Sequence, residues 1–352
     1  MRYFPKVYII LLNYNGWADT IECLESLLRI DYPNYQIIVV DNNSPNNSLE
    51  YIKLWAEGKL DVWVNPKHPL RKLSFPPSEK PIPYIFFDKK NKKKQRYNLE
   101  RQTSGKFRNN TPLIFIQTGE NLGFAGGNNV AIEFALEQND FEYICLLNND
   151  TVVEKNFLSK IIEKMGKNKN IGICSCRINY YDFPKKIWFD GGYFNKFLAR
   201  GIHYNEDKIE SEVKNIKEDI TFLTGCLMVI RKDVLKEIRL NNDYFMYMED
   251  LEFSLKAIEK GYKLSIEKEA KIYHKVGVSS GGKTSKFSAY WGMRNWVIFI
   301  KTNLKLKQRI IPFSIIFLSL FKQLITGNFP KLKAQLKGLA SGLKYRKMKN
   351  HT

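Results

Sequence analysis

The stretch CLLNNDTVV, residues 145–153, passes from an apolar run directly into three polar side chains. Residues 143–148 have the length and composition of a buried β-strand, and Asn148, Asn149 and Asp150 stand at its carboxyl end. Asn and Asp are common in turns because their side chains hydrogen-bond the local backbone. Taken alone, the stretch is an ordinary strand-to-turn exit. In a suitable fold, the same strand end would present a carboxylate to a charged ligand.

Two earlier strand-like runs end in the same way. VYIILLNY, residues 7–14, and YQIIVVDNNS, residues 35–44, are apolar, β-branched segments that finish in polar side chains. The polar residues concerned are Asn13, Asn15, Asp41 and Asn43. Three strand ends of this kind are more than turn chemistry requires, so together they indicate a shared ligand site.

The spacing of the apolar segments predicts an α/β fold. A helix-like segment at 19–30 separates the first two strands, and the alternation of strand and helix resumes over 113–178. A further short strand is expected at 61–65. This alternation is typical of a mostly parallel sheet flanked by helices. In such a sheet ligands bind beyond the carboxyl ends of the strands, which is where the polar clusters fall.

The net charge of +20 is concentrated in two segments. Residues 66–112, rich in Pro and Lys, carry a net +10 and interrupt the alternation, so we expect a basic insertion there. Residues 283–352 carry +15 and no acidic residue, while the rest of the chain is mildly acidic. Such basic segments meet anionic surfaces, or are simply solvated faces. We expect a catalytic domain over 1–282 and a basic helical region over 283–352.

The basic C-terminal region contains the apolar segment IIPFSIIFLSLFKQLI, residues 310–325, which Lys322 interrupts. A membrane span needs about 20 apolar residues, so a helix lying in the membrane interface fits better. A helix packed on the catalytic domain remains the alternative. The N-terminus lacks a signal-peptide pattern, and the five cysteines lie mostly in apolar runs. We therefore expect a cytoplasmic protein, peripheral on the inner face of the cell membrane.

Three further features could carry chemistry. The segment FMYMEDLEFSLKAIEKGY, residues 245–262, places Glu249 and Asp250 at the start of a helix, where acids also simply stabilise the helix dipole. His274 ends a later strand-like run. The glycine-rich stretch GENLGFAGGNN, residues 119–129, allows close backbone approach to an anion, but it is no dinucleotide-binding fingerprint.

Together these segments resemble the family-2 glycosyltransferases of the GT-A (Rossmann-like) fold, in particular their rhamnosyltransferase-like branch. The matching segments, in chain order, are VYIILLNYNG, CLESLL, IIVVDNNS, ENLGFAGGNN, LLNNDTVV, FLTGCLMVIRKDVL, YFMYMEDLEFSLKAIEKGY, IYHKVGVSS, YWGMRNW and AQLKGLASGL. The resemblance extends over nearly the whole chain outside 66–112. The chain departs from the family in having Asn-Asn-Asp in place of a stricter Asp-x-Asp, and Lys256 where Arg is common.

The resemblance implies an inverting glycosyltransferase that moves a sugar, plausibly rhamnose, from a nucleotide-diphosphate donor to a hydroxyl of a saccharide or lipid-linked saccharide. Asp250 would be the general base, and Glu249 would lie near the acceptor. Asp150 and His274 would bind a divalent cation, Mn²⁺ or Mg²⁺, on the diphosphate. The residues implied in nucleotide-sugar binding are Asn13, Asn15, Asp41, Asn43, Asn129, Asn148 and Asn149.

Other classes explain less of the sequence. A glycoside hydrolase would account for a carboxylate pair but not for the strand ends or the glycine stretch. A sugar nucleotidyltransferase would need a Gly- and Arg-rich loop after the first strand, where LNYNGW stands. A basic membrane- or nucleic-acid-binding protein without catalytic activity would carry basic residues through its core, which is net negative here.

Overall fold

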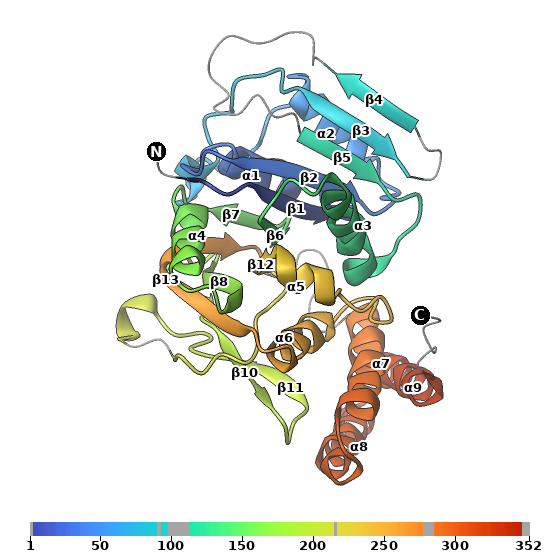
Figure 1. Cartoon of the computed structure of the whole chain (residues 1–352). Helices are drawn as coiled ribbons and strands as arrows, with labels where there is room; N and C mark the ends of the chain where they lie inside the picture. Colours follow the sequence, from blue (N-terminus) through green and yellow to red (C-terminus); the bar gives the residue numbers. More distant parts are fainter. Residues whose placement is uncertain (1–2, 90–92, 98–112, 215–216, 277–284, 347–352) are drawn as a thin grey trace.

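The structure is a computed structural model that describes residues 3–89, 93–97, 113–214, 217–276 and 285–346. Its centre is an 11-stranded sheet in the order β4-β3-β5-β2-β1-β6-β12-β8-β13-β7, with β9 paired to β8 (Figure 1). The strands are β1 (Val7–Asn13), β2 (Tyr35–Asp41), β3 (Tyr84–Asp88), β4 (Lys93–Tyr97), β5 (Leu113–Gln117), β6 (Tyr143–Asn148), β7 (Thr151–Val153), β8 (Ile171–Tyr180), β9 (Ile187–Phe189), β12 (Leu227–Arg231) and β13 (Lys263–His274). The predicted α/β sheet is confirmed.

The parallel half of the sheet brings the polar strand ends together. Strands β3, β5, β2, β1 and β6 run parallel, while β12 is antiparallel to β6 and β8. Asn13 is in register with Asp41, and Leu12 with Asn148. The carboxyl ends of β1, β2 and β6 therefore meet at one edge of the sheet, as the sequence predicted.

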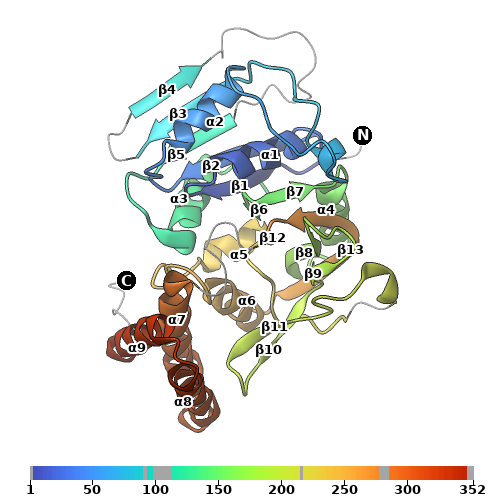
Figure 2. The ribbon, with the colours of Figure 1, turned by 180° about the vertical axis from the view of Figure 1, so that it is seen from behind.

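Helices cover both faces of this sheet. In Figures 1 and 2, α1 (Trp17–Leu27) and α2 (Ser48–Ala56) lie on one face, and α3 (Gly123–Gln138) lies on the opposite face. The remaining helices of this part are α4 (Phe157–Lys167), α5 (Lys232–Glu237) and α6 (Glu249–Glu259). Buried aliphatic side chains of β1, β2 and β6 form the centre of the core, which is why these strands read as continuous apolar runs.

The predicted strand at 61–65 is wrong, because these residues lie outside the sheet. The edge of the sheet beside β5 is instead formed by β3 and β4, which come from the segment expected to be an insertion. Tyr84 and Phe86 alternate into the core and are buried, so β3 has the period-2 pattern of an ordinary strand. The basic character of the surrounding residues obscured this pattern.

A two-stranded hairpin, β10 (Gly192–Asn195) and β11 (Arg200–His203), lies beside the main sheet. The chain then ends in α7 (Lys286–Asn303), α8 (Ile310–Ile325) and α9 (Phe329–Lys344). Helix α7 buries Val297, Phe299 and Ile300 in the main core. Helix α9 packs closely on α7, because Gly338 and Gly342 leave no side chain between the two backbones. Helix α8 points away from the sheet (Figures 1 and 2).

Candidate active site

The ends of β1 and β2 are joined by a buried hydrogen-bond network. The Asn13 side-chain amide donates to Asp41 Oδ1 over 2.7 Å, and the Ser44 hydroxyl donates to the same oxygen over 2.6 Å. Asn13 Oδ1 accepts from the Gly16 backbone and from the Thr20 hydroxyl, each at 3.1 Å. Because Asn13 and Asp41 are buried and mutually bonded, they form a rigid floor at this edge of the sheet.

The end of β6 joins the same network through Asn149, whose amide donates to the Thr20 hydroxyl over 2.8 Å. Asn148 is only partly buried. Asn15 and Asn43 lie at the open side, both exposed and with φ of 62° and 61°, a left-handed conformation that Asn tolerates well. The structure thus brings six of the seven predicted donor-binding residues to one edge, where Asn15 and Asn43 are accessible to a ligand.

The glycine stretch packs against this edge. The Asn42 amide donates to Asn121 Oδ1 at 2.9 Å and to the Gly123 carbonyl at 3.1 Å, and Asn42 Oδ1 accepts from the Leu122 backbone at 3.0 Å. Gly123 has a φ of 69°, and a Cβ there would lie 2.2 Å from the Phe245 carbonyl oxygen. Gly123 is therefore required because the two backbones approach closely. Asn42, which is not among the predicted site residues, holds the turn.

The Asn129 side chain binds residues outside this polar edge. Its side-chain amide donates to the Leu240 carbonyl at 2.8 Å and to Asn242 Oδ1 at 2.6 Å, and the residue is buried. In this arrangement it joins α3 to the loop that precedes α6. Its predicted place beside the nucleotide stays a prediction.

Asp150 and His274 form the second corner of the site. His274 Nε2 lies 3.2 Å from Asp150 Oδ1, and both residues are buried. The backbone of Lys275 donates to the Asp150 carbonyl over 2.9 Å, and the ring of Trp188 meets the imidazole edge-on at 4.5 Å. Burial lowers the pKa of His274, but Cys226 and the Asp150 carboxylate beside it raise that pKa well above its usual range.

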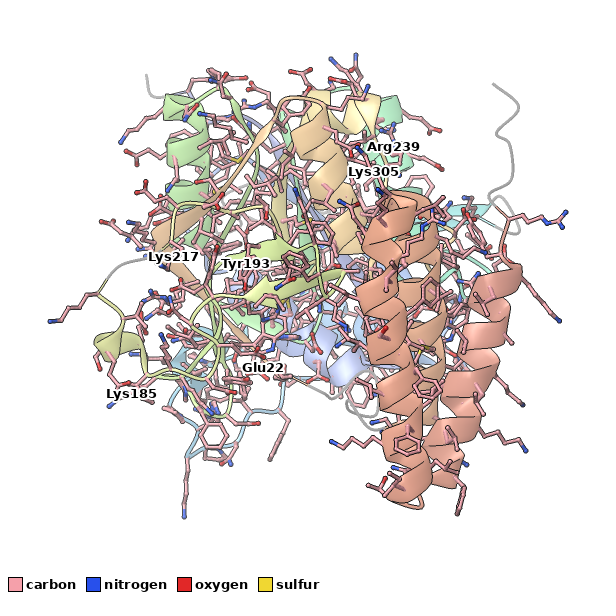
Figure 3. The ribbon with its side chains drawn as sticks, turned by 90° about the horizontal axis from the view of Figure 1, so that it is seen from below. Glu22, Lys185, Tyr193, Lys217, Arg239 and Lys305 are labelled. Carbon is pink, nitrogen blue, oxygen red and sulfur yellow. The ribbon has the colours of Figure 1, made fainter. Side chains whose placement is uncertain are left out.

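An ion cluster anchors the end of β13 on α1. Lys275 Nζ contacts Asp19 Oδ1 at 2.7 Å and Glu22 Oε2 at 2.5 Å, and Glu22 also accepts from the Tyr181 hydroxyl at 2.7 Å. Glu22 is labelled in Figure 3. Burial lowers the pKa of Lys275, and the two carboxylates more than offset this effect. The cluster therefore holds the backbone that carries His274.

The carboxylate pair begins α6. Asp250 Oδ2 accepts from the Gly225 backbone at 3.1 Å, and Asp250 Oδ1 from the Leu251 backbone at 2.8 Å. Burial raises the pKa of Asp250, and these two N–H donors oppose the shift. Burial and the neighbouring Asp250 charge raise the pKa of Glu249 well above its usual range, and Glu249 Oε2 has no hydrogen-bond partner among the described residues. The backbone donors thus favour the ionised form of Asp250, whereas no described residue stabilises a charge on Glu249 Oε2 in this way.

Trp188 and His203 connect the Asp150–His274 pair to the carboxylate pair that begins α6. The ring of Trp188 lies 4.5 Å from that of His274 and 5.3 Å from that of His203, between ring centroids. His203, on β11, lies close enough to Asp250 that its charge lowers the pKa of that carboxyl. Neither Trp188, on β9, nor His203, on β11, stood in a sequence pattern that marks a site, because each reaches it through tertiary packing.

Among the described residues there is no group of three or more His, Cys, Asp or Glu side chains arranged to hold a metal ion. The pair Asp150–His274 nevertheless offers one carboxylate oxygen and one imidazole nitrogen that converge to 3.2 Å. Two ligands of one cation have this separation when each bond is about 2.1–2.2 Å long, the values typical of such donors. The pair therefore fits a divalent cation whose remaining ligands come from elsewhere.

Comparisons with known proteins identify the family of the chain. Residues 8–68 and 90–239 match the model of the family described as glycosyl transferase family 2. A curated relative, the low-salt glycan biosynthesis hexosyltransferase Agl10 of Haloferax volcanii, is 26% identical over 185 residues, which span 52% of this chain and 58% of that protein. The chain thus spans little more than half the length of that relative.

Two solved structures resemble the fold. A mannosyltransferase from Pyrobaculum calidifontis, solved with GDP-Man and Mn²⁺, matches with a TM-score of 0.50 and 14% identity, over 98% of this chain and 77% of that one. GalNAc-T7, solved with UDP, GalNAc and Mn²⁺, matches with a TM-score of 0.53 and 13% identity, over 86% and 48%. The fold is that of the GT-A glycosyltransferases. The chain belongs to glycosyl transferase family 2.

Proposed function

We propose that this protein is an inverting glycosyltransferase that transfers a sugar, with rhamnose the favoured candidate, from a nucleoside diphosphate to a saccharide or lipid-linked saccharide hydroxyl. The observation that carries the proposal is the placement of Asp250. Its carboxylate is partly buried, fixed by two backbone N–H groups and connected through His203 and Trp188 to the Asp150–His274 corner. A site of this kind offers a base on one side and a charge-stabilising pair on the other.

The donor would lie over the floor formed by Asn13, Asp41 and Asn149. Amide and carboxylate groups at strand ends can hydrogen-bond a base and a ribose, as the general rule for ligands of parallel sheets suggests. The exposed Asn15 and Asn43 would contact the donor directly, with Asn148 beside them. Relatives with this fold, solved with GDP-Man or with UDP, support a nucleotide-linked donor.

A divalent cation, Mn²⁺ or Mg²⁺, would be held by Asp150 and His274. When bound, it would supply Lewis-acid stabilisation of the leaving diphosphate. The Mn²⁺ in the two similar structures supports this assignment. The chain's own contribution is to hold the two side chains in place: the Lys275 backbone binds the Asp150 carbonyl, and Trp188 fixes the imidazole ring.

Asp250 would take the proton from the acceptor hydroxyl as that oxygen attacks the anomeric carbon. Burial raises its pKa toward the working range of a base, while the Gly225 and Leu251 amides keep the carboxylate oriented. Glu249 would contact the acceptor in its neutral form, which can donate a hydrogen bond. A single displacement from the face opposite the leaving group inverts the anomeric configuration.

The C-terminal helices would place the enzyme on an anionic membrane surface, facing the cytoplasm. By length and composition alone, residues 306–325 are sufficient to cross a membrane, and only 17% of that window is buried. However, α8 packs one side against protein through Pro312 and Ile316, and its middle contacts α9 where Gln335 meets Ser319. A helix with one packed and one exposed apolar side suits the interface better than a span.

The exposed apolar residues of α8 recur at helical spacing along one side. They are Ile310, Ile311, Phe317, Leu318, Phe321, Leu324 and Ile325. Basic residues flank them, and the whole segment 283–352 lacks an acid. In Figure 3, Lys305 marks the connection between α7 and α8. This combination of apolar side and basic flank supports an anionic lipid surface, where a lipid-linked acceptor would also reside.

The proposal is tested by donor binding followed by product analysis. A thermal-shift panel of deoxythymidine-, uridine- and guanosine-diphosphate sugars with Mn²⁺ should show a selective rise of the melting temperature, because a ligand bound only by the folded state stabilises it. Transfer to a saccharide acceptor should then give a product of inverted anomeric configuration by NMR. If no nucleotide sugar shifts the melting temperature, or if the product retains its configuration, the proposal is wrong.

A further inference from the structure

The loop that leads into the carboxylate pair has an unfavourable backbone conformation. Tyr247 and Met248, the two residues directly before Glu249, have φ of 74° and 77°. L-amino acids other than Asn and Asp rarely adopt this left-handed region, and two consecutive cases are rarer still. Such a conformation persists only where surrounding contacts determine it, and it is found disproportionately at functional sites.

The contacts that determine this loop come from α7. Asn295 is fully buried, and its side-chain amide donates to the Met246 carbonyl at 2.7 Å and to the Tyr247 carbonyl at 3.3 Å. Its Oδ1 accepts from Arg294 Nη1 at 2.6 Å, and the same Nη1 donates to the Asp243 carbonyl at 2.9 Å. Two adjacent residues of α7 thus bind three carbonyl groups of residues 243–247.

Side-chain contacts hold the same loop on both of its sides. The ring of Phe245 stacks on that of Trp291 at 4.6 Å and 19°, and the Tyr247 hydroxyl lies 2.9 Å from the Ser288 hydroxyl. On the donor side, the Phe245 carbonyl accepts from the Phe124 backbone at 2.7 Å. The loop is therefore fixed between α7 and the glycine stretch, and α6 begins where this fixed loop ends.

We propose that Asn295 is the positioning residue for the general base: by binding the carbonyls of Met246 and Tyr247, it sets the direction in which α6 presents Asp250. The inference rests on the proposed function for the role of Asp250. Asn295 is fully buried and would act through this loop, and no other described side chain donates to these two carbonyls. A displacement of about 1 Å at a reacting group lowers the rate by roughly 10²-fold.

The test uses the full chain with Asn295→Asp and Asn295→Ala, and Asn170→Ala as a control. The Asp variant keeps the shape and can still accept from Arg294, but an ionised carboxylate cannot donate to the carbonyls. Asn170 lies directly before β8, is exposed, and its side chain makes no hydrogen bond with another described residue. Measurements are kcat, KM for the donor, the pH profile of kcat, and amide hydrogen exchange over 243–251.

Both Asn295 variants should lose about 10²-fold in kcat, with donor KM within about threefold of the parent chain. In the Ala variant, the acid limb of the pH profile should move to higher pH, because a displaced Asp250 loses the amide donors that favour its ionised form. Exchange over 243–251 should accelerate. The Asn170 variant should match the parent chain in all four measurements.

Two results would overturn the inference. One is an Asn295→Ala protein with the kcat and pH profile of the Asn170 control. The other is unchanged exchange over 243–251, which would show that other contacts hold the loop. The exchange measurement needs no turnover, so it decides the inference even if the parent chain transfers no sugar. That last outcome would refute the proposed function separately.

Discussion

The two sides of the proposed site are built by opposite means. On the donor side, Asn13, Asp41 and Asn149 lie at the ends of neighbouring strands and bind one another and Thr20. On the acceptor side, Glu249 is buried, Asp250 is partly buried, and both have raised pKa values. The loop before them is held in a left-handed conformation by α7. The donor side is a satisfied network, whereas the acceptor side is a strained assembly. In the proposed reaction, the acceptor side would supply the base.

This contrast predicts that changes on the acceptor side lower turnover while leaving donor binding intact. Asp250→Asn should reduce kcat by about 10³-fold, because general-base catalysis contributes roughly 10²–10⁴-fold, and donor affinity should stay within about threefold. Steady-state kinetics with a titration of the donor measures both. The control is Asp233→Asn on α5, whose side chain is 62% exposed. Normal turnover by a folded Asp250→Asn protein would remove Asp250 from the role of base.

Changes at the proposed metal-binding pair, Asp150 and His274, should instead weaken donor binding. Asp150→Ala, or chelation of divalent cations in the parent chain, should raise the donor Kd by about 10²-fold, because the cation would bridge protein and diphosphate. Isothermal titration with and without Mn²⁺ makes the measurement, with Asp182→Ala, exposed on a nearby loop, as the control. Donor binding that is indifferent to chelator would exclude Asp150 and His274 as metal ligands.

Changes on the exposed apolar side of α8 should weaken membrane binding and leave the difference between the donor and acceptor sides unchanged. Phe317→Glu combined with Phe321→Glu, both exposed, should lower binding to anionic vesicles by about tenfold or more, because two apolar side chains no longer enter the lipid. Turnover of a soluble acceptor should be unchanged. Phe183→Glu, equally exposed but on the sheet domain, is the control in the same sedimentation assay. Equal vesicle binding by both variants would argue against α8 as the lipid-facing element.

The smallest expected effect concerns stability and pH. Because the folded state raises the pKa of Glu249, it binds more protons than the unfolded state between the ordinary Glu pKa and the raised value, so stability falls as pH rises through that window. Glu249→Gln removes this loss. Its melting temperature should exceed that of the parent chain by about 2 °C or more at pH 8, with no gain below about pH 4.

Glu50→Gln, on an exposed side chain of α2, should change the melting temperature little at either pH. A gain for Glu249→Gln that is equal at pH 4 and pH 8 would mean that charge burial is not its cause. Burial of the Glu249 charge would then not destabilise the acceptor side, and the contrast with the satisfied donor side would be weaker.

The sheet and its polar edge could be predicted from the sequence because both depend on local patterns. Continuous apolar runs mark strands buried on both faces, and Asn13, Asp41 and Asp150 follow them directly along the chain. Parallel strands then bring their carboxyl ends together whatever else the chain does. The strand β3 was missed because its alternating pattern lies within a basic, Pro-rich context.

The remaining contributors to the site depend on contacts between distant segments. Trp188 approaches His274 from β9 and His203 approaches Asp250 from β11. The amide of Asn295 reaches the carbonyls of Met246 and Tyr247 across 49 and 48 residues of the chain. No periodicity records such contacts. By itself, the sequence determined the family, most of the sheet and the positions of the carboxylates. The tertiary structure alone decided what holds these carboxylates and how their pKa values are shifted, because burial and backbone donors come from distant segments.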